Sequence, residues 1–297
     1  MKLGIAFFPA DFAIRPDELA RAVEERGFES LFFTDHTHIP ATPQTRKLME
    51  EAQGGVPPHF THNYDPFVAL TYAAAATQTL RLGTGVCLVP EREPIATAKA
   101  LASLDILSHG RLLFGVGVGW IPEETANHGI DPPTRWAVMD ERVQAMRAIW
   151  TQDEAEYHGR YVNFGPIWSW PKPKQRPHPP ILVGGAGKGV TRRVLAYGDE
   201  WMPHAGMPVE QLGARIRELQ HAARTAGRDA DIPVTVQGAE PDARALDELR
   251  EVGVTRATLY APSADADQVL RFLDDVAPLV DATGQRRSAE RAMWVQP

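Results

Sequence analysis

The chain has 297 residues and a formal net charge of -7; 43% of its residues are hydrophobic and 23% are charged. This balance is typical of folded globular proteins and argues against disorder, and the negative charge argues against a surface that binds nucleic acid. The single cysteine, Cys87, excludes an intrachain disulfide framework, and no apolar run reaches the roughly 20 residues that a membrane-spanning helix needs.

The N-terminus enters a strand-like run at once, without a signal-peptide pattern, so the cytoplasm is the expected compartment. Seven further runs rich in β-branched and aromatic residues follow along the chain. The eight predicted strands cover residues 3–8, 30–34, 82–89, 112–118, 181–183, 200–203, 232–236 and 257–260.

The segments between these runs carry helical periodicity or long excursions. In residues 16–26, for example, Leu19, Ala22 and Val23 form one apolar stripe, and Gly27 supplies the C-terminal stop. Eight alternating strand and helix units, in a chain somewhat longer than the roughly 250 residues of one barrel, predict an α/β fold: a single (β/α)8 TIM barrel with insertions over residues 1–280, followed by a tail over residues 281–297. The other predicted helices cover residues 66–76, 95–107, 135–150, 209–226, 242–252 and 265–280.

Two excursions are longer than ordinary barrel loops: residues 37–64 after the second predicted strand and residues 157–180 before the fifth. The second holds Trp168, Trp170 and the proline-rich run 171–180, and it is interpreted as a wall of the barrel mouth. Long barrel loops usually carry function, so their aromatic residues indicate a small-molecule substrate that is apolar or bears a ring.

Glycines mark the third and fourth predicted strands. Because glycine has no side chain, a flat ring could approach the barrel backbone closely at these positions. The alternative is packing, since small residues also fit the tapering interior of a barrel. The glycines concerned are Gly83, Gly85, Gly115, Gly117 and Gly119.

Residues 181–194 form a predicted strand, a glycine-rich turn and the start of a helix. Such a turn points free backbone amides and a helix N-terminus at an anion, so a phosphate is the expected guest; a simple connecting loop is the alternative. Lys188, Arg192 and Arg193 lie nearby in the chain and could add positive charge. Barrels usually hold phosphate after strands seven and eight, whereas this turn follows the fifth strand.

Asp35 and His36 stand at the end of the second predicted strand, where barrel side chains enter the active site, and histidine can exchange a proton near neutral pH. His36 and His38 also form an HxH pair that, with His204, would suit a metal-dependent hydrolase. The eighth strand, ATLYAP, brings no aspartate to such a centre, and no metal site is predicted.

Glu123 and Glu124 raise the alternative of glycosidic chemistry. Adjacent carboxylates rarely aim at one bond, and no second carboxylate at a strand end is obvious. The pair is therefore interpreted as the start of a helix.

Several stretches of the chain resemble the luciferase-like monooxygenase superfamily, in particular its branch that uses the deazaflavin coenzyme F420. They are TDHTHIP at 34–40, AKALASLDILSHGR at 98–111, GVGVGW at 115–120, MDERVQAMRAIW at 139–150, YHGRYVNF at 157–164 and PPILVGG at 179–185. The resemblance spans about two thirds of the chain, and it implies a (β/α)8 barrel that binds a flavin or deazaflavin ring at its mouth and forms a homodimer through barrel helices.

The resemblance also implies site residues. Asp35 and His36 would lie beside the ring and are the candidate catalytic residues. A non-prolyl cis peptide that supports the ring is expected within residues 85–87, while Cys87 itself is interpreted as a small buried residue rather than a nucleophile. The expected cofactor-binding residues are Thr84, Gly85, Val86, Cys87, Gly115, Gly117, Gly119 and Trp120, with Gly184, Gly185 and Ala186 around the phosphate.

The function that this implies is an oxidoreductase that uses coenzyme F420 for hydride transfer to or from a small organic substrate. Lys172, Lys174 and Arg176 are interpreted as contacts for the acidic oligoglutamate tail of that coenzyme. The main alternative is an FMN-dependent monooxygenase of the same superfamily. A metal-dependent hydrolase and a flavin-binding protein without turnover are the remaining alternatives.

Overall fold

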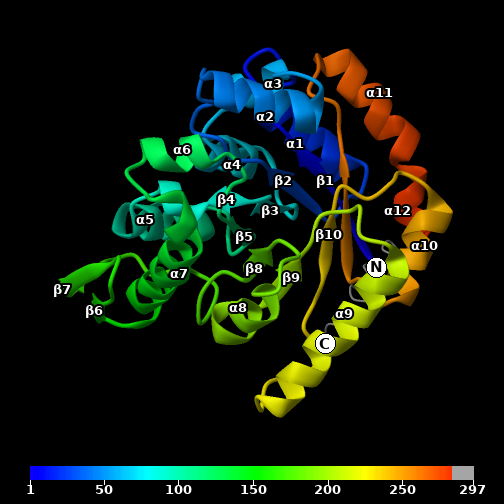
Figure 1. Ribbon diagram of the computed structural model, residues 1–297. Helices are drawn as coiled ribbons and strands as arrows, with labels where there is room; N and C mark the ends of the chain where they lie inside the picture. The colour runs from blue at the N-terminus through cyan, green and yellow to red at the C-terminus, as the bar shows by residue number, and fades with distance from the viewer. Residues whose placement is uncertain (283–297) are drawn as a thin grey trace.

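The computed structural model describes residues 1–282, so all but the first two residues of the predicted 281–297 tail lie outside the described residues. Parallel strands form a barrel surrounded by helices (Figure 1). Along the sheet the order is β10-β11-β1-β2-β3-β5-β8-β9, and bridges from Trp201 to Val234 and from His204 to Gln237 bring β9 to β10. The predicted (β/α)8 barrel is confirmed. Its strands are β1 (Lys2–Phe7), β2 (Ser30–Phe33), β3 (Arg81–Thr84), β5 (Leu112–Gly117), β8 (Ile181–Gly184), β9 (Glu200–Met202), β10 (Thr235–Gln237) and β11 (Arg256–Tyr260).

The third predicted strand is interrupted. It consists of β3 and of β4 (Cys87–Leu88), which pairs with β5 beyond the break at Gly85 and Val86. The peptide bond between Gly85 and Val86 is cis, so the expectation of a non-prolyl cis peptide within residues 85–87 is confirmed.

Helices follow the strands and cover the outside of the barrel. Aspartates cap several of them: the side chain of Asp65 accepts hydrogen bonds from the first amides of α4, and Asp242 and Asp265 do so in α10 and α11. The predicted last helix is two helices, divided before Pro278, which has no amide hydrogen to donate. The outer helices are α1 (Pro16–Glu25), α4 (Pro66–Ala76), α5 (Pro94–Leu107), α7 (Arg135–Thr151), α8 (Val190–Tyr197), α9 (Val209–Thr225), α10 (Ala243–Glu251), α11 (Ala266–Val276) and α12 (Pro278–Ala282).

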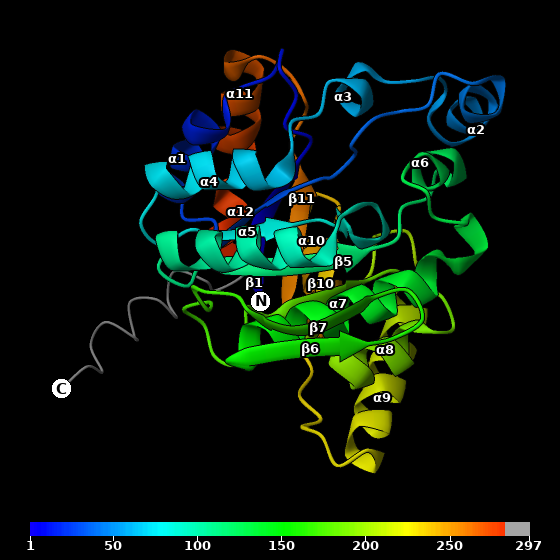
Figure 2. The same cartoon turned by 90° about the vertical axis from the view of Figure 1, so that its left-hand side faces the viewer.

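Additional short helices lie beyond one end of the barrel (Figure 2). The excursion over residues 37–64 contains α2 (Pro43–Gln53) and α3 (Pro58–Thr61), and α6 (Pro122–Asn127) follows β5. The strands that precede these helices, β2 and β5, end on this side of the barrel, so the helices border its mouth. Within residues 1–282, none of the helices combines the length and apolar content that crossing a membrane requires.

The excursion over residues 157–180 does not form a wall of the mouth, and that prediction is wrong. It completes an antiparallel hairpin of β6 (Glu154–His158) and β7 (Asn163–Trp168), which lies against α7 and extends away from the barrel (Figure 1). The chain then passes under the opposite end, where the Gln175 side chain donates to the carbonyl oxygen of Leu112, the first residue of β5. A connection from a helix to the next strand lies at the end where strands begin, whereas the mouth is built from strand-to-helix connections.

This placement also contradicts the interpretation of Lys172, Lys174 and Arg176 as contacts for an acidic coenzyme tail at the mouth. Lys172 is buried, and its ammonium donates to the carbonyl oxygens of Ile149 (2.6 Å) and Gln152 (2.5 Å) at the C-terminal end of α7. A cation at this end of a helix offsets the helix dipole and satisfies carbonyl groups without helical partners. The role of Lys172 is therefore structural.

An ion cluster lies where the strands begin. The Arg256 guanidinium donates to Glu29 (2.9 and 3.1 Å) and to Glu200 (2.9 and 3.1 Å), and all three side chains are largely buried. Burial by itself would raise the pKa of Glu29, but Arg256 and then Lys2 lower it from 4.5 to about 2. A separate apolar cluster inside the barrel is formed by Phe32, Leu113, Leu182 and Met202, with Val86 packed against it.

Replacing Arg256 should strongly destabilise the fold. An Arg256→Met variant leaves two buried carboxylates without their cation, so we expect a loss of about 3–5 kcal/mol in the free energy of unfolding, measured by urea denaturation at pH 7. Arg244→Met is the matched control: Arg244 pairs with Glu248 on an exposed helix face, so its loss should change the free energy of unfolding little. Equal effects of the two variants would contradict the assignment.

The same cluster predicts a pH dependence. Because the pKa of Glu29 is lower in the folded protein than in the unfolded chain, its contribution to stability is present above pH 4.5 and is lost as the pH falls from 4.5 towards 2. We expect the stability of the wild type to decline over this window, and the decline to be smaller in Arg256→Met. Unfolding curves at stepped pH values measure both slopes.

Candidate active site

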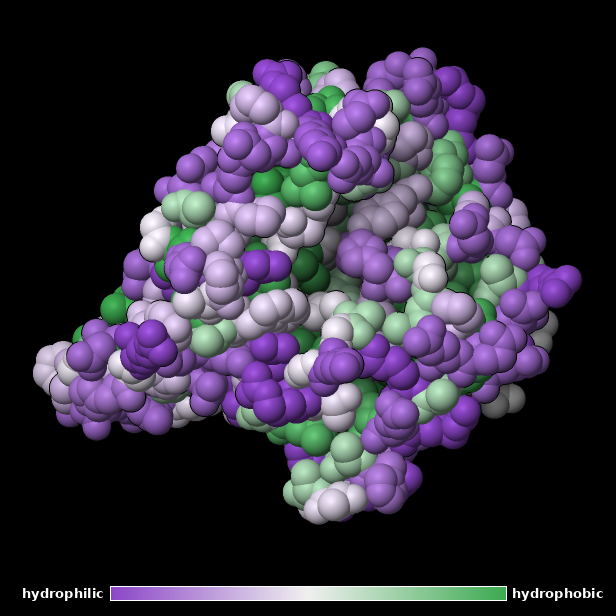
Figure 3. Space-filling model, in the orientation of Figure 1, coloured by the Kyte–Doolittle hydropathy of each residue, from purple (hydrophilic) through white to green (hydrophobic). Residues whose placement is uncertain are grey.

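A cavity of about 660 Å³ opens at the mouth of the barrel. Figure 3 shows a hollow near the middle of this face, with apolar residues exposed inside it. The ends of β2, β3, β5, β8, β9, β10 and β11 line the cavity, and α2, α3 and α7 border it. Its described lining contains no lysine or arginine. The barrel therefore presents a largely apolar pocket of the size that small ligands occupy.

One wall of the cavity is aromatic. Phe8 follows β1, and its ring lies 4.6 Å from the ring of His59, 5.0 Å from that of Phe60 and 5.9 Å from that of Tyr260. Trp120, which follows β5, packs edge-on to Phe60 at 6.2 Å. Burial, and then the neighbouring His36, lower the pKa of His59, which favours its neutral ring. The predicted site residue Trp120 thus belongs to the cavity, whereas Phe8, Phe60 and Tyr260 were not among the predicted site residues.

Val86 forms part of the cavity floor, and the neighbouring glycines make room for it. A Cβ atom on Gly117 would overlap the Cγ2 of Val86, and one on Gly184 would lie 2.9 Å from the carbonyl oxygen of Val116 and 3.1 Å from Val86 Cγ1. The packing alternative accordingly explains these glycines directly: the space left by their missing side chains is filled by protein atoms. What they provide to the cavity is the position of Val86.

Gln237, at the end of β10, was not predicted as a site residue. Its side-chain amide is buried and donates to the carbonyl oxygen of Gly85 at 2.5 Å, across the barrel. Gln237 also lines the cavity. The contact fixes the first residue of the break between β3 and β4. A polar residue at the end of a strand was a sequence signal for Gln237 as a site residue, though not for its partner.

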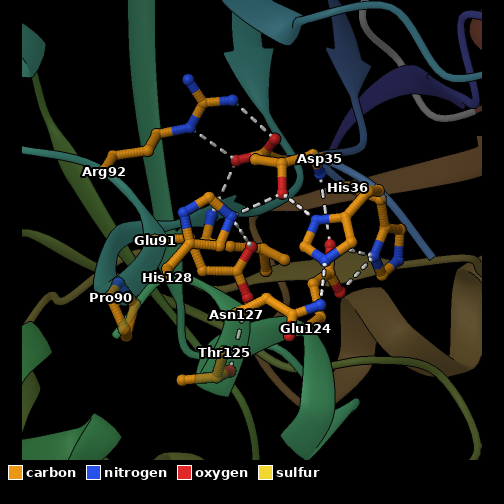
Figure 4. A network of polar contacts seen from close by, with 12 residues as sticks. Asp35, His36, Pro90, Glu91, Arg92, Glu124, Thr125, Asn127 and His128 are labelled. Atoms are coloured by element: carbon orange, nitrogen blue, oxygen red, sulfur yellow. Dashed lines mark hydrogen bonds and ion pairs between the residues drawn. The ribbon is translucent and has the colours of Figure 1, made fainter. Parts of the chain in front are cut away.

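His36 and Glu124 form a buried pair at the side of the cavity (Figure 4). Nδ1 of His36 lies 2.9 Å from Glu124 Oε2, and the backbone N–H of Thr37 donates to Oε1 of the same carboxylate at 3.2 Å. A carboxylate only accepts hydrogen bonds, so Nδ1 carries the hydrogen. The pair leaves His36 Nε2 without a hydrogen-bond partner in the described part of the chain. The predicted helix start at Glu123 and Glu124 is confirmed by α6, whereas the contact of Glu124 with His36 was not predicted.

Asp35 has a different environment from His36. The Arg92 guanidinium donates to both of its carboxylate oxygens, at 2.7 and 2.9 Å, and the backbone N–H of Leu88 donates at 2.9 Å. Arg92 also donates to Asp65. Asp35 therefore ties the end of β2 to β4 and to the segment after it, while its carboxylate is fully engaged by donors.

The glycine-rich turn after β8 spans residues 185–189. Gly185 has a φ of +99°, a conformation that favours glycine, and within residues 1–282 the backbone amides of 186–189 have no backbone acceptor. The Arg215 guanidinium contacts the carbonyl oxygens of Ala186 and Gly187, not the amides of this turn. Lys188 is exposed beside them. Free amides at the start of α8 form a cradle suited to an anion.

The two arginines of α8 are not free to bind that anion. Arg192 and Arg193 both form ion pairs with Asp140 of α7, at 2.6 and 2.8 Å. Arg193 also lies over the ring of Trp136, 4.2 Å from its centroid, and Trp136 lines the cavity next to Gly185. Of the three cations named from the sequence, only Lys188 is without an ion pair in the described chain.

The structure brings together most of the predicted cofactor-binding residues but not all. Thr84 is buried and donates to the carbonyl oxygen of Gly115, and burial raises the pKa of the Cys87 thiol, as expected for an inert buried cysteine. Ala186 is exposed outside the cavity, on the glycine-rich turn. The predicted residues that line the cavity are Asp35, His36, Gly85, Val86, Gly117, Gly119, Trp120, Gly184 and Gly185.

The HxH pair does not converge on a metal position. His36 faces Glu124, whereas Nδ1 of His38 contacts the Thr37 hydroxyl and Nε2 contacts the side chain of Asn127. Within residues 1–282, no three histidine, cysteine or acidic side chains are arranged to hold a metal ion.

The arrangement of barrel, cavity and strand-end residues agrees with a comparison to known families. The family model described as luciferase-like monooxygenase matches residues 15–295, nearly the whole chain. The chain belongs to this family. A solved structure of an F420-dependent secondary alcohol dehydrogenase superposes with a TM-score of 0.74 at 18% identity, covering 94% of this chain and 98% of that one, which shows the common fold.

The relatives of this luciferase-like chain differ in the activity and the cofactor that their names give. An uncharacterized protein of Mycobacterium tuberculosis is 36% identical over 93% of this chain and 98% of its own length. The F420-dependent glucose-6-phosphate dehydrogenase of Kineococcus radiotolerans is 29% identical over 96% of this chain and 78% of its own. The FMNH2-dependent dimethylsulfone monooxygenase of Pseudomonas putida is 30% identical over 62% of this chain and 52% of its own. The named relatives are redox enzymes, with two different cofactors.

The packing of Val86 in this luciferase-like barrel can be tested by a double-mutant cycle. Gly117→Ala forces a methyl group against Val86 and should cost about 1–3 kcal/mol in the free energy of unfolding. Val86→Ala removes the overlapping methyl groups, so the double variant should cost clearly less than the sum of the two single variants. Gly165→Ala is the control, since its Cβ would meet no atom within 4 Å. Additive single costs, measured by urea denaturation, would refute the contact.

Proposed function

We propose that the chain is an oxidoreductase that uses coenzyme F420 to transfer hydride to or from a small, uncharged organic substrate in the cavity. The observation that carries the proposal is His36, which lines the cavity while Nδ1 is held by Glu124. Hydride transfer from an alcohol carbon requires the hydroxyl to release a proton, and hydride transfer to a carbonyl carbon requires the oxygen to take one up. A histidine oriented by a carboxylate can perform that step near neutral pH.

The residues present fit a deazaflavin or flavin coenzyme. The cavity has a floor at Val86 and an aromatic wall, so it accepts a flat ring, and the free amides of residues 186–189 suit the phosphate of such a coenzyme. When bound, the coenzyme supplies the hydride acceptor or donor. Within the proposal, Val86 and Gln237 fix the floor and the glycine-rich turn binds the anion.

Chain coverage favours F420 over FMN. The F420-dependent relative matches 96% of this chain, whereas the FMNH2-dependent relative matches 62%. The second candidate function, an FMN-dependent monooxygenase, is supported by that relative and by the description of the family. Both functions would use the same cavity. The coenzyme that binds there therefore distinguishes them.

His36 is the proposed acid or base, and Asp35 the proposed positioning residue. Nε2 of His36 is the nitrogen available to accept a proton from a substrate hydroxyl or to donate one to a carbonyl, while Glu124 stabilises the charged ring. Asp35 holds the end of β2 through Arg92 and Leu88.

The cavity lining indicates the substrate class. Asp35 is the single acidic residue of the cavity lining in the described chain, and its buried carboxylate is paired with Arg92; no lysine or arginine lines the cavity. A charged substrate would be desolvated there without a partner, which is costly. An uncharged alcohol or carbonyl compound with an alkyl or ring substituent fits the aromatic wall.

Titration with the two coenzymes tests the choice of cofactor. We expect F420 to bind about tenfold or more tightly than FMN, a difference of about 1.4 kcal/mol or more, because the proposed site is a deazaflavin site. Changes in the absorbance and fluorescence of each coenzyme give the two dissociation constants. Tighter binding of FMN would replace the leading proposal with the monooxygenase.

Replacement of His36 tests the acid–base role. In His36→Gln the rate of hydride transfer at saturating coenzyme should fall roughly 10²- to 10⁴-fold, because the proton transfer loses its catalyst. Single-turnover reduction of F420 with a panel of uncharged alcohols measures the rate, and coenzyme titration checks that binding is retained. His158→Gln, on the exposed hairpin strand β6, is the control and should react like the wild type. An unchanged rate in His36→Gln would exclude the role.

The homodimer and the cytoplasmic location inferred above belong to the same proposal. Val68 and Tyr72 of α4 are exposed apolar side chains on the barrel exterior, which suits a contact between copies of the chain through barrel helices. Light scattering of the purified protein measures the oligomeric state.

A further inference from the structure

A second buried carboxyl group, that of Glu91, lies next to His128 and to one side of the pair of His36 and Glu124 (Figure 4). Glu91 ends the short 3-10 helix Val89–Glu91, and its side chain, like that of Glu124, has no exposed surface. The two groups are close enough for the charge of Glu124 to disfavour ionisation of Glu91, and Asp35 acts in the same direction. A buried carboxylate near another negative charge is costly to ionise, which favours a proton on one of the two groups.

Glu124 is surrounded by donors. It accepts from His36 Nδ1 at 2.9 Å and from the backbone N–H of Thr37 at 3.2 Å. It also stands in the first turn of α6, where the helix dipole favours a negative charge. Each of these three contacts stabilises the ionised form of Glu124.

Glu91 lacks comparable donors. Its Oε1 accepts a 3.3 Å contact from the hydroxyl of Thr125, and its Oε2 has no hydrogen-bond partner. Nε2 of His128 lies 3.8 Å from Oε2, beyond hydrogen-bond distance. Burial, and then the nearby His38, lower the pKa of His128, so His128 brings no positive charge at neutral pH.

The cations near Glu91 are engaged elsewhere. The Arg92 guanidinium donates to Asp35 through Nε and Nη2 and to Asp65 through Nη1. From α7, Arg142 donates to backbone carbonyl oxygens of the turn that contains Glu91, those of Val89, Pro90 and Arg92. In the described chain, neither Arg92 nor Arg142 forms a hydrogen bond or ion pair with Glu91, although Nε of Arg142 has no partner.

We propose that Glu91 is a protonated carboxylic acid at neutral pH and that Glu124 is the single ionised carboxylate behind His36. Glu91 then acts as a positioning residue. By remaining neutral it leaves Glu124 to accept from His36 Nδ1, which directs Nε2 to the cavity. Burial and the charges of Glu124 and Asp35 raise the pKa of Glu91 to about 8, in agreement with this geometry.

Ionisation of Glu91 would change the site. A second negative charge near Glu124 would disfavour the ionised form of Glu124, which is the form that accepts the hydrogen of His36 Nδ1. The orphaned Oε2 faces His128, which the Thr37 hydroxyl contacts at 2.7 Å near the surface, so the proton of Glu91 lies next to a path of polar groups that reaches solvent. The effect on catalysis rests on the proposed role of His36, but the protonation of Glu91 does not.

Infrared spectroscopy of the coenzyme-free protein tests the protonation directly. The wild type should show the carbonyl stretching band of a buried carboxylic acid at pH 7, and this band should disappear in Glu91→Gln and be titrated away near pH 8. In Glu124→Gln the band should persist and disappear at lower pH, because a neighbouring charge has gone. Glu123→Gln, which removes the adjacent carboxylate bonded to Thr42 and Thr45, is the control and should leave the band unchanged.

A band that survives Glu91→Gln, or one that Glu124→Gln abolishes, would overturn the assignment. Thermal unfolding gives an independent readout. Because the pKa of Glu91 is higher in the folded protein, the fold binds a proton that the unfolded chain releases above pH 4.5, so stability falls as the pH rises from 4.5 to 8. The Tm of Glu91→Gln relative to the wild type should therefore rise across this window. A constant difference would contradict the proposal, and neither result depends on which coenzyme binds.

Discussion

Eight parallel strands leave their carboxyl ends on one face of the barrel, and this constraint decides where each part of the candidate site lies. His36 follows β2, Gly117 ends β5 and Gln237 ends β10, so residues 201 positions apart in the chain line one cavity. The reverse also holds. Each helix returns the chain to the opposite end, which is why the aromatic and proline-rich segment before β8 contacts Leu112 and cannot reach the mouth.

The barrel, its strand order and the cis peptide were predictable because periodicity and the family resemblance can both be recognised in short stretches of sequence. The strand and helix patterns repeat regularly enough to fix eight units, and the ends of strands two to five indicated His36, Gly85 and Gly184 as parts of one site. The position of residues 157–180 was predicted wrongly from composition. The decisive fact was their place in the order of elements, after a helix and before a strand, and not their tryptophans.

Contacts between distant segments were beyond sequence reasoning. Glu124 meets His36 across 88 positions, and Gln237 meets Gly85 across 152. Neither contact has a local pattern, since a glutamate in the first turn of a helix is ordinary and a glutamine at a strand end has many uses. Glycine was ambiguous for a related reason: the sequence shows that a side chain is missing at Gly117 but not that Val86, rather than a ligand, fills the space.

Two glutamates show how the barrel separates structural charge from functional charge. Glu29, where the strands begin, is paired with Arg256, and its pKa falls to about 2; Glu91, near the mouth, has no free cation, and its pKa rises to about 8. Both are largely buried, so burial alone cannot explain the opposite directions. Arg256 lowers the pKa of Glu29, whereas the negative charges of Glu124 and Asp35 add to the effect of burial on Glu91. An apolar layer that includes Phe32 and Met202 lies inside the barrel. Its low dielectric leaves the interactions between neighbouring charges strong. The cluster around Arg256 thus supports folding at any pH near neutrality, while the proposed proton on Glu91 would leave Glu124 as the ionised partner of His36.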